Sequence, residues 1–219
     1  MNEDQKLRLD LLAACGYDIK AAQKRLNFVL YGNEVNKQEP DSYILADGIY
    51  LIDTTGNAIR YSSKNIENIK SIEYIGIVQG NRSLAIALHD VCEDKITLTV
   101  DKGNKVHYNF KDAYINAVQD WDGKINTEKL KQIGLNPVIQ LKDDEYIPTL
   151  AEMYLICLNQ KAINMAMRLV DGQELKRWYW SSTEYGISDA WTLYLDNGSA
   201  YYSNKATSIN RVRPVKKFL

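Results

Sequence analysis

The spacing of apolar residues changes near Tyr43, and this change restricts the chain to a fold that mixes helices with antiparallel strands. Before Tyr43, apolar side chains recur at helical intervals. After it, apolar residues alternate with polar ones, and turns rich in Gly and Asn separate the alternating segments. This pattern is typical of hairpins. The expected hairpins pair 48–53 with 58–61, 72–78 with 83–89, and 96–100 with 106–110.

Helical patterns follow these hairpins, and strand patterns return near the C-terminus. Helices are expected over 111–120, over 126–133 and from 149 to about 170. The last begins with the capping box Thr149-Leu150-Ala151-Glu152. Strands are expected over 190–195, 199–203 and 209–215, with an Asp196-Asn197-Gly198 turn between the first two. The predicted fold class is therefore α+β.

The first 35 residues form a predicted N-terminal helical segment. Two helices within 5–31 carry a stripe that includes Leu7, Leu11 and Leu26. Two short helices bury little surface, so the stripe must be covered by the main domain or by another copy of the chain, which would make a homo-oligomer. Residues 36–42 are polar and are predicted to be a linker. Residues 43–219 are predicted to be one domain.

Charge and composition exclude several partners. The net charge of −1 favours neither nucleic acid nor an anionic membrane, and no apolar stretch reaches the roughly 20 residues of a membrane span. The three cysteines are far apart, which favours free buried thiols over disulfides. No signal peptide is evident, because the apolar run before Cys15 is too short. We therefore expect a phage virion or the cytoplasm rather than the cell surface.

Catalytic and metal-binding patterns are missing from the sequence. Its two histidines, His89 and His107, each lie in an alternating strand pattern and are expected to be structural. The run Asp143-Asp144-Glu145 is expected to be a solvated turn rather than a cation site. No nucleophile elbow, dinucleotide fingerprint, phosphate loop or zinc motif occurs. We therefore predict no enzyme, no metal and no cofactor.

Residues 185–210 have an unusual composition. Of these 26 residues, 15 are Tyr, Ser, Asn, Asp or Thr, and Lys205 is the only Lys, Arg or Glu. Antibody loops use a similar mixture, because rigid amphipathic rings and small hydrogen-bonding side chains contact many ligands. Alternation within 191–195 places Trp191 and Leu193 in the core and places Thr192 and Tyr194 on a polar-aromatic face. The segment is predicted to bind a ligand; the alternative is a solvent-facing hairpin with incidental tyrosines.

Several motifs resemble bacterial and phage domains with the C-type lectin fold, which is related to the fold of the formylglycine-generating enzyme. They are Trp180-Ser181-Ser182-Thr183-Glu184-Tyr185, Ala190-Trp191, Asp196-Asn197-Gly198 and Arg211-Val212-Arg213-Pro214-Val215, with 120–124 and 147–152 upstream. The resemblance covers about 45–219. It implies a C-type lectin-like domain in which Trp180 and Trp191 fill the core and the arginines pair inside the fold.

Within this group the sequence is similar to the variable proteins of diversity-generating retroelements, including phage tropism determinants. In those proteins, mutagenesis of template adenines diversifies surface codons on the lectin fold. The cysteine pair of the formylglycine-generating enzyme is absent from the C-terminal region, so its copper-dependent oxidation is not implied. Calcium-binding lectin motifs such as Glu-Pro-Asn are also absent.

The resemblance and the composition together predict a non-enzymatic protein of phage or prophage origin that binds an unknown protein or glycan through a diversifiable surface. An invariant lectin-fold adhesin or structural domain of a bacterial surface is the alternative. An enzyme related to the formylglycine generator would require cysteines that the sequence lacks. The predicted ligand-binding residues are Ile187, Ser188, Thr192, Tyr194, Ser199, Tyr201, Tyr202, Ser203, Thr207, Ser208 and Ile209.

Overall fold

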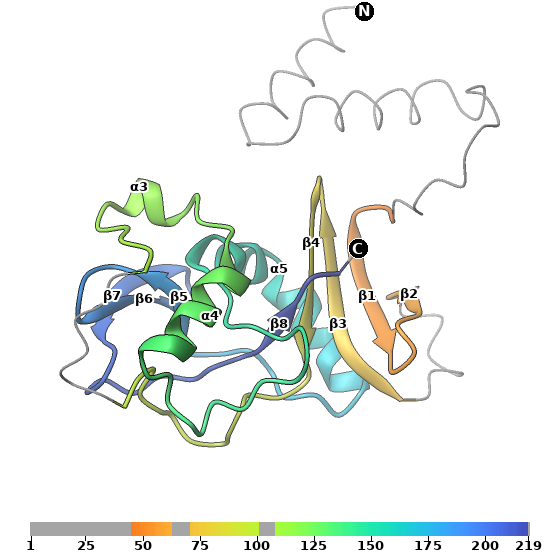
Figure 1. Ribbon diagram of the computed structural model, residues 1–219. Coiled ribbons are helices and arrows are strands. Elements are labelled where there is room, and N and C mark those ends of the chain that lie inside the picture. Colours follow the sequence, from red (N-terminus) through yellow and green to blue (C-terminus); the bar gives the residue numbers. More distant parts are fainter. Residues whose placement is uncertain (1–44, 63–70, 101–107, 219) are drawn as a thin grey trace, which may run out of the picture. The chain divides into compact units, whose positions relative to one another are not determined.

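The computed structural model describes residues 45–62, 71–100 and 108–218 as an α+β protein (Figure 1). The predicted helical segment 1–35, the linker 36–42 and His107 lie outside the described residues. Two compact units emerge from the contacts: residues 1–48 with 78–83, and residues 49–77 with 84–219. In the described part of the first unit, the Asp47 carboxylate accepts a hydrogen bond from the Gly80 amide at 3.0 Å.

One sheet contains five strands in the order β2-β1-β3-β4-β8. Its strands are β1 (Gly48–Asp53), β2 (Ala58–Arg60), β3 (Ile72–Gln79), β4 (Arg82–Ala87) and β8 (Val215–Lys216). The first two predicted hairpins are thus confirmed, and Leu51 lies opposite Ile59 between β1 and β2. In the turn that joins those strands, the Asp53 carboxylate accepts hydrogen bonds from the amides of Thr55 and Asn57.

The second sheet is antiparallel, with strand order β5-β6-β7. Its strands are β5 (Trp178–Glu184), β6 (Asp189–Tyr194) and β7 (Ser199–Asn204). The pairing of β5 with β6 shifts between Trp180 and Glu184, which marks a bulge. The register of β6 with β7 is continuous. The predicted strands over 190–195 and 199–203 are therefore confirmed to within one residue at either end.

Three helices are described: α3 (Tyr114–Ala117), α4 (Gly123–Ile133) and α5 (Leu150–Leu169). The predicted capping box opens α5, because Thr149 Oγ1 accepts from the Glu152 amide and the Glu152 carboxylate accepts from the Thr149 amide. Helix α5 packs against β5 and β6, and α4 packs against β5. No helix of the described residues is both long and apolar enough to cross a membrane.

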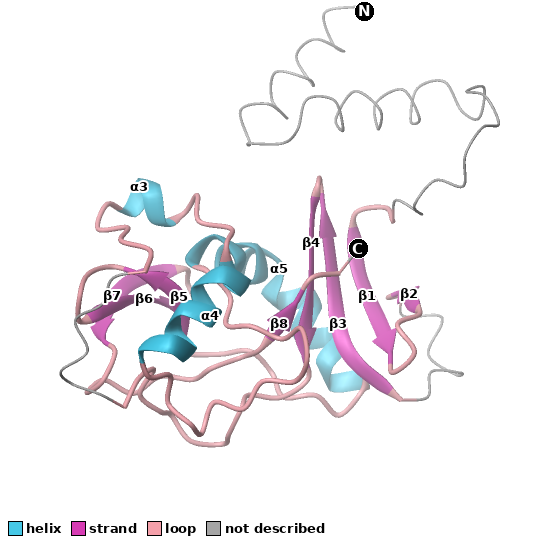
Figure 2. Cartoon of the chain, in the orientation of Figure 1, coloured by secondary structure: helices cyan, strands magenta, loops and turns pink. Residues whose placement is uncertain are grey.

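Three sequence-based predictions of secondary structure are wrong. Ile96 bridges Asn210 and Phe110 bridges Glu184, so the described parts of the third predicted hairpin pair with distant segments instead of with each other. The helix predicted over 111–120 shrinks to the four residues of α3, and the strand over 209–215 is reduced to single bridges before β8. Figure 2 shows that the described segments between β4 and α4 and between β7 and β8 are mostly loop. Local periodicity missed these loops because side chains far apart in sequence hold them.

Two apolar clusters lie in the larger unit, and each contains one tryptophan. Trp191 belongs to the first cluster with Leu51, Ile86, Met153 and Leu193. The second cluster gathers Leu98, Leu130, Ile147, Trp180 and Val212. Both indole N–H groups are satisfied at 2.7 Å, by the carbonyls of Ile96 for Trp180 and Lys111 for Trp191. The expected burial of both tryptophans is confirmed.

The C-terminal arginines pair inside the fold, as expected. The Arg213 side chain is 2% exposed and donates to Asp90 Oδ1 at 2.7 Å. It also donates to the carbonyls of Ala87, Leu88 and Gln173. Arg211 donates to the other oxygen of the same carboxylate at 3.1 Å. Asp90 therefore adds a side-chain anchor between the C-terminal segment and the end of β4, next to the antiparallel pairing of β4 with β8.

Candidate functional site

The β6–β7 hairpin supplies the centre of the predicted binding surface. Gly198 adopts a φ of 75°, a left-handed conformation that glycine adopts without strain, and its amide donates to the Tyr194 carbonyl at 2.8 Å. The Asn197 side chain accepts from the Ser199 amide at 2.9 Å and completes the turn. The hairpin then places Tyr202 opposite Trp191 and Tyr201 opposite Thr192. The predicted turn is confirmed.

Two tyrosine rings of β7 and one from the loop between β5 and β6 are stacked in parallel; we call Tyr185, Tyr201 and Tyr202 the tyrosine stack. Tyr202 lies 3.8 Å from Tyr185 and 5.0 Å from Tyr201 between ring centroids, with interplanar angles of 3° and 4°. Trp191 meets Tyr185 and Tyr202 edge-on. Tyr201 is 60% exposed and Tyr202 is 39% exposed. The stack thus joins the apolar core to the molecular surface.

Tyr201 and Tyr202 come together although the β7 strand is regular. We expected an irregularity in β7 to bring Tyr201, Tyr202 and Ser203 together, because adjacent residues of a strand point to opposite faces. This expectation is wrong: the register is unbroken. Strand β7 forms an edge of its sheet among the described residues. No further strand of the described residues covers β7 there, and the Tyr201 ring stacks on that of Tyr202 with the two centroids 5.0 Å apart.

Two of the predicted ligand-binding residues, Thr192 and Tyr194, lie against the tryptophans of β5. Thr192 is 1% exposed, and its hydroxyl donates to the Tyr201 carbonyl. It lies opposite Trp180 of β5, so the second apolar cluster covers the face that alternation assigned to solvent. Tyr194 is half-buried, with its ring 5.1 Å from that of Trp178. The placement of Thr192 on the binding face is therefore corrected.

The remaining predicted residues lie around the hairpin. Ile187, Ser188, Ser199, Thr207 and Ile209 are exposed, whereas Ser203 and Ser208 are half-buried. The loop before β6 and the loop after β7 lie side by side, because the Lys205 amide donates to the Ser188 carbonyl at 2.8 Å. The structure therefore brings Ser188 next to the segment that bears Thr207 and Ser208. Their role in binding stays a prediction.

Lys205, the only Lys, Arg or Glu in 185–210, is buried. Its side chain is 3% exposed, and Nζ lies 2.6 Å from Oε1 of Glu184, whose side chain is fully buried. Glu184 Oε2 also accepts from the amides of Tyr108 and Asn109. A lone lysine in a segment otherwise free of Lys, Arg and Glu was the one signal that could have indicated this role. The surface consequently lacks the positive charge that its sequence suggests.

A polar network around Asp120 holds the loop over 108–111, which contacts Trp191. The Asp120 carboxylate accepts from the side chains of Asn109, Asn126 and Thr183 at 2.7–2.9 Å. The neighbouring Lys111 donates its amide to the Glu184 carbonyl and accepts the Trp191 indole N–H with its own carbonyl. The loop over 108–111 thus fixes the Trp191 ring through the hydrogen bond that the Lys111 carbonyl accepts from the indole. Sequence analysis did not identify this network, because its members are distant along the chain.

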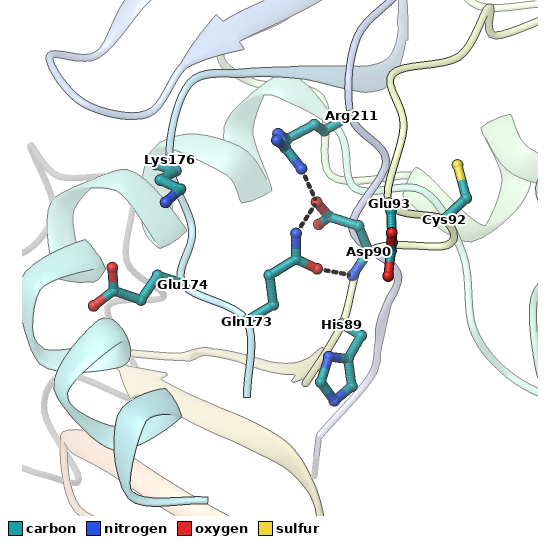
Figure 3. Close-up of a pocket in the computed structure, with 8 residues that line it drawn as sticks. All are labelled: His89, Asp90, Cys92, Glu93, Gln173, Glu174, Lys176 and Arg211. Atoms are coloured by element: carbon teal, nitrogen blue, oxygen red, sulfur yellow. Dashed lines mark hydrogen bonds and ion pairs between the residues drawn. The ribbon is translucent and has the colours of Figure 1, made fainter. Parts of the chain in front are cut away.

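A cleft of about 660 Å³ lies elsewhere, around Asp90 (Figure 3). Its lining residues are His89, Asp90, Cys92, Glu93, Gln173, Glu174, Lys176 and Arg211. His89 is exposed in a bend after β4, which corrects its predicted place within a strand. The Asp90 carboxylate is engaged by Arg211, Arg213 and the Gln173 amide group. Asp90 therefore holds the cleft wall together.

The cleft lacks an activated nucleophile among the described residues. His89 and Cys92 make no hydrogen bond to one another there; the Cys92 thiol instead donates to the Asp94 carbonyl at 3.1 Å. Burial raises the pKa of the Cys92 thiol, so it remains protonated at neutral pH and is a weak nucleophile. Both described cysteines are half-buried free thiols, whereas full burial was expected.

The acidic run forms a turn, but one of its residues is buried. Asp143 and Asp144 are exposed, and Asp144 pairs with Lys124, whereas Glu145 is buried and accepts from the Tyr74 hydroxyl at 2.9 Å. The expectation of a solvated turn is thus corrected for Glu145. Within the described ranges, no three His, Cys, Asp or Glu side chains are arranged to hold a metal ion.

Fold and surface together describe an α+β protein with an aromatic-polar hairpin surface on a buried, hydrogen-bonded framework. Comparison with known proteins adds no relative: no family model and no curated sequence matches the chain.

Proposed function

We propose that this chain is a non-enzymatic ligand-binding protein that displays a diversifiable surface on a C-type lectin-like fold, of phage or prophage origin. The observation that carries the proposal is the separation of display residues from framework residues along one hairpin. Ile187, Tyr201 and Ile209 project into solvent, whereas Trp191 and Leu193 are buried between them in sequence. Such a separation lets surface residues change while the fold is kept.

Buried ion pairs hold the framework side of this separation. The loops on either side of the hairpin are held by the buried pair of Lys205 with Glu184, and the C-terminal segment is held by Arg213 with Asp90. These anchors use side chains that lie outside the predicted variable positions. A ligand-binding surface needs this kind of support, because affinity falls when loops must be ordered on binding.

A library experiment tests the proposal. Codons 187, 188, 201, 202 and 209 are randomised in a displayed copy of the chain, and a matched library randomises codons 190, 191, 193, 195 and 212. We expect most members of the first library to fold and most members of the second to fail, as scored by protease resistance. Selection of the first library on unrelated protein targets should yield binders. Equal folding losses in the two libraries would refute the proposal.

The DNA around the gene offers an independent test of diversification. The proposal requires a reverse-transcriptase gene nearby, together with an adenine-rich near-copy of the DNA that encodes about 180–215. Long-read sequencing of the locus from many cells should then show substitutions confined to adenine positions of that near-copy. An invariant locus with neither element would contradict diversification, while ligand binding by the surface could still hold.

One observation favours the alternative, an invariant adhesin or structural domain. The tyrosine stack depends on three particular residues. The ring centroid of Tyr202 lies 3.8 Å from that of Tyr185 and 5.0 Å from that of Tyr201. A randomised surface would assemble such a stack only rarely, whereas an invariant surface would retain it in every copy. Sequences from related loci distinguish the two, because the alternative requires tyrosine at 185, 201 and 202 throughout.

A further inference from the structure

We infer that the tyrosine stack of Tyr185, Tyr201 and Tyr202 receives the guanidinium group of an arginine side chain on a protein ligand. The inference rests on the proposed function, since it names the chemistry that the same surface recognises. It depends on three features of the described residues: the parallel rings, the carboxylates beside them and the loss of the local lysine to a buried pair.

The rings offer a flat and partly open aromatic surface. Tyr201 is the most exposed of the three, at 60%, and its ring lies within 4° of parallel to that of Tyr202. Trp191 supports the stack edge-on, and its indole is fixed by the Lys111 carbonyl. The rings are therefore held in place before any ligand arrives, and a planar group can stack on them at little cost in side-chain entropy.

Two carboxylates lie beside the stack without partners among the described residues. Asp112 is exposed and Asp189 is half-buried, and neither side chain makes a hydrogen bond or ion pair in the described ranges. Burial, Tyr202 and then these two aspartates raise the pKa of the Tyr185 hydroxyl. Of these causes, the two aspartates act through their negative charge, so both carboxylates contribute a negative potential at the Tyr185 ring. The site therefore attracts a cation.

No lysine of the hairpin competes for this potential. Lys205 is 3% exposed and is paired with Glu184, so its charge is neutralised inside the fold. In the adjacent segment 108–114, Lys111 carries one positive charge and Asp112 one negative charge. Counting Asp189 as well, the charges of Lys111, Asp112 and Asp189 leave an excess of one negative charge. This balance favours a single cationic group.

Arginine fits these features better than lysine or a sugar. Its guanidinium is planar, stacks on aromatic faces and donates forked hydrogen bonds that match a carboxylate. A lysine ammonium is compact and strongly hydrated, and cannot stack. A neutral sugar can stack on a tyrosine ring but gains nothing from the negative charge. Cation–π contact at a partly exposed ring, combined with a carboxylate, is the recognition that we assign.

Short capped peptides provide the test with the full chain. Gly-Arg-Gly, Gly-citrulline-Gly and Gly-Lys-Gly are titrated against the protein while the tyrosine ring signals are followed by NMR. Citrulline is neutral and close to arginine in shape, so it isolates the charge. We expect the arginine peptide to bind about three- to thirty-fold more tightly than the citrulline peptide, with lysine between them. The shifts should be largest for the tyrosine stack.

Matched variants locate the binding. Tyr201→Ala should abolish the arginine preference and Tyr201→Phe should retain it, because stacking needs the ring and not the hydroxyl. The double variant Asp112→Asn with Asp189→Asn should weaken the arginine peptide and leave the citrulline peptide unchanged. Leu158→Ala is the control, since this residue of α5 is 77% exposed and belongs neither to the stack nor to the predicted ligand-binding residues. Circular dichroism checks that each variant remains folded.

Three results would overturn the inference: equal binding of the arginine and citrulline peptides, binding that survives Tyr201→Ala, or a response to methyl glucoside without one to the arginine peptide. The last would identify a glycan ligand instead. None of them bears on the library experiment, so failure here leaves the proposed function standing. Conversely, a library that cannot tolerate changes at the display positions would refute the function even if arginine binds.

Discussion

Strands β6 and β7 belong to one hairpin and are paired residue for residue, yet they differ completely in burial. Every residue of β6 from Ala190 to Leu193 is buried, whereas no residue of β7 is. The cause is position: β6 lies between two strands and between two apolar clusters, whereas β7 lies at the edge of its sheet among the described residues. Two neighbouring strands of one hairpin can therefore differ in burial, so that one belongs to the core and the other exposes its side chains.

The largest expected effect comes from the buried strand. Trp191→Ala should lower the free energy of unfolding by about 3–5 kcal/mol, because it leaves a cavity and an unpaired Lys111 carbonyl. Thermal and urea unfolding measure the change, and Tyr202→Ala on the facing strand is the control, expected to cost much less. If the two substitutions proved equally destabilising, β6 and β7 would not differ in the way that their burial indicates.

Lys205 tests how far the contrast holds, because it follows β7 directly and is nevertheless buried. Lys205→Met should cost about 3 kcal/mol, since it leaves the Glu184 carboxylate buried without its cation. The double variant Lys205→Met with Glu184→Gln should recover much of this loss, because no charge then remains. A double-mutant cycle in urea gives the coupling energy. A coupling near zero would mean that the pair does not anchor the hairpin.

The framework should also respond to pH through Glu152. Burial raises the pKa of this carboxyl to about 7, against the hydrogen bonds from Thr149 and Tyr146 that lower it. The folded pKa exceeds the unfolded value of about 4.5, so the native state binds more protons between these values. Stability contributed by Glu152 is thus present below pH 4.5 and is lost as pH rises toward 7, by up to about 1 kcal/mol per pH unit.

Glu152→Gln isolates this contribution. Unfolding measured from pH 5 to 8 should depend less on pH in the variant than in the unmodified chain, and the variant should gain relative stability at the alkaline end. Variants confined to β7 should keep the pH dependence of the unmodified chain. A Glu152→Gln profile parallel to that of the unmodified chain would show that another group is responsible.

The smallest expected effect comes from the display surface. Replacing Ile187, Ser188, Tyr201 and Ile209 together with Ala or Ser should change stability by about 1 kcal/mol or less, because exposed substitutions act weakly. Binding of any selected target should be lost. Tyr194 is left out because it packs against Trp178. A fourfold variant that unfolds while Trp191→Ala remains stable would show that core and surface are reversed.

Patterns local in sequence predicted much of the framework. Alternation and turn residues identified the hairpins of β1 with β2, β3 with β4 and β6 with β7, and the Thr149 capping box marked the start of α5. These features depend on residues within a few positions of each other. The interior positions of Trp180, Trp191 and Arg213, which the motif resemblance implied, are also confirmed. Eight of the proposed binding positions remain exposed or lie in the adjoining loops, although their function is still a proposal.

Only the tertiary structure decided the rest, because contacts between distant residues set the outcome. Thr192 is buried since the second apolar cluster covers its face, and Lys205 is buried since Glu184 lies within reach across the fold. In the described loops over 88–100, 108–112 and 205–214 local alternation predicted strand segments, whereas Asp90, Asp120 and single bridges to distant residues hold these loops. Alternation along a strand predicts that one of its faces is buried. It cannot predict that the second face is buried as well, as at Thr192, or that the rings of Tyr201 and Tyr202 stack.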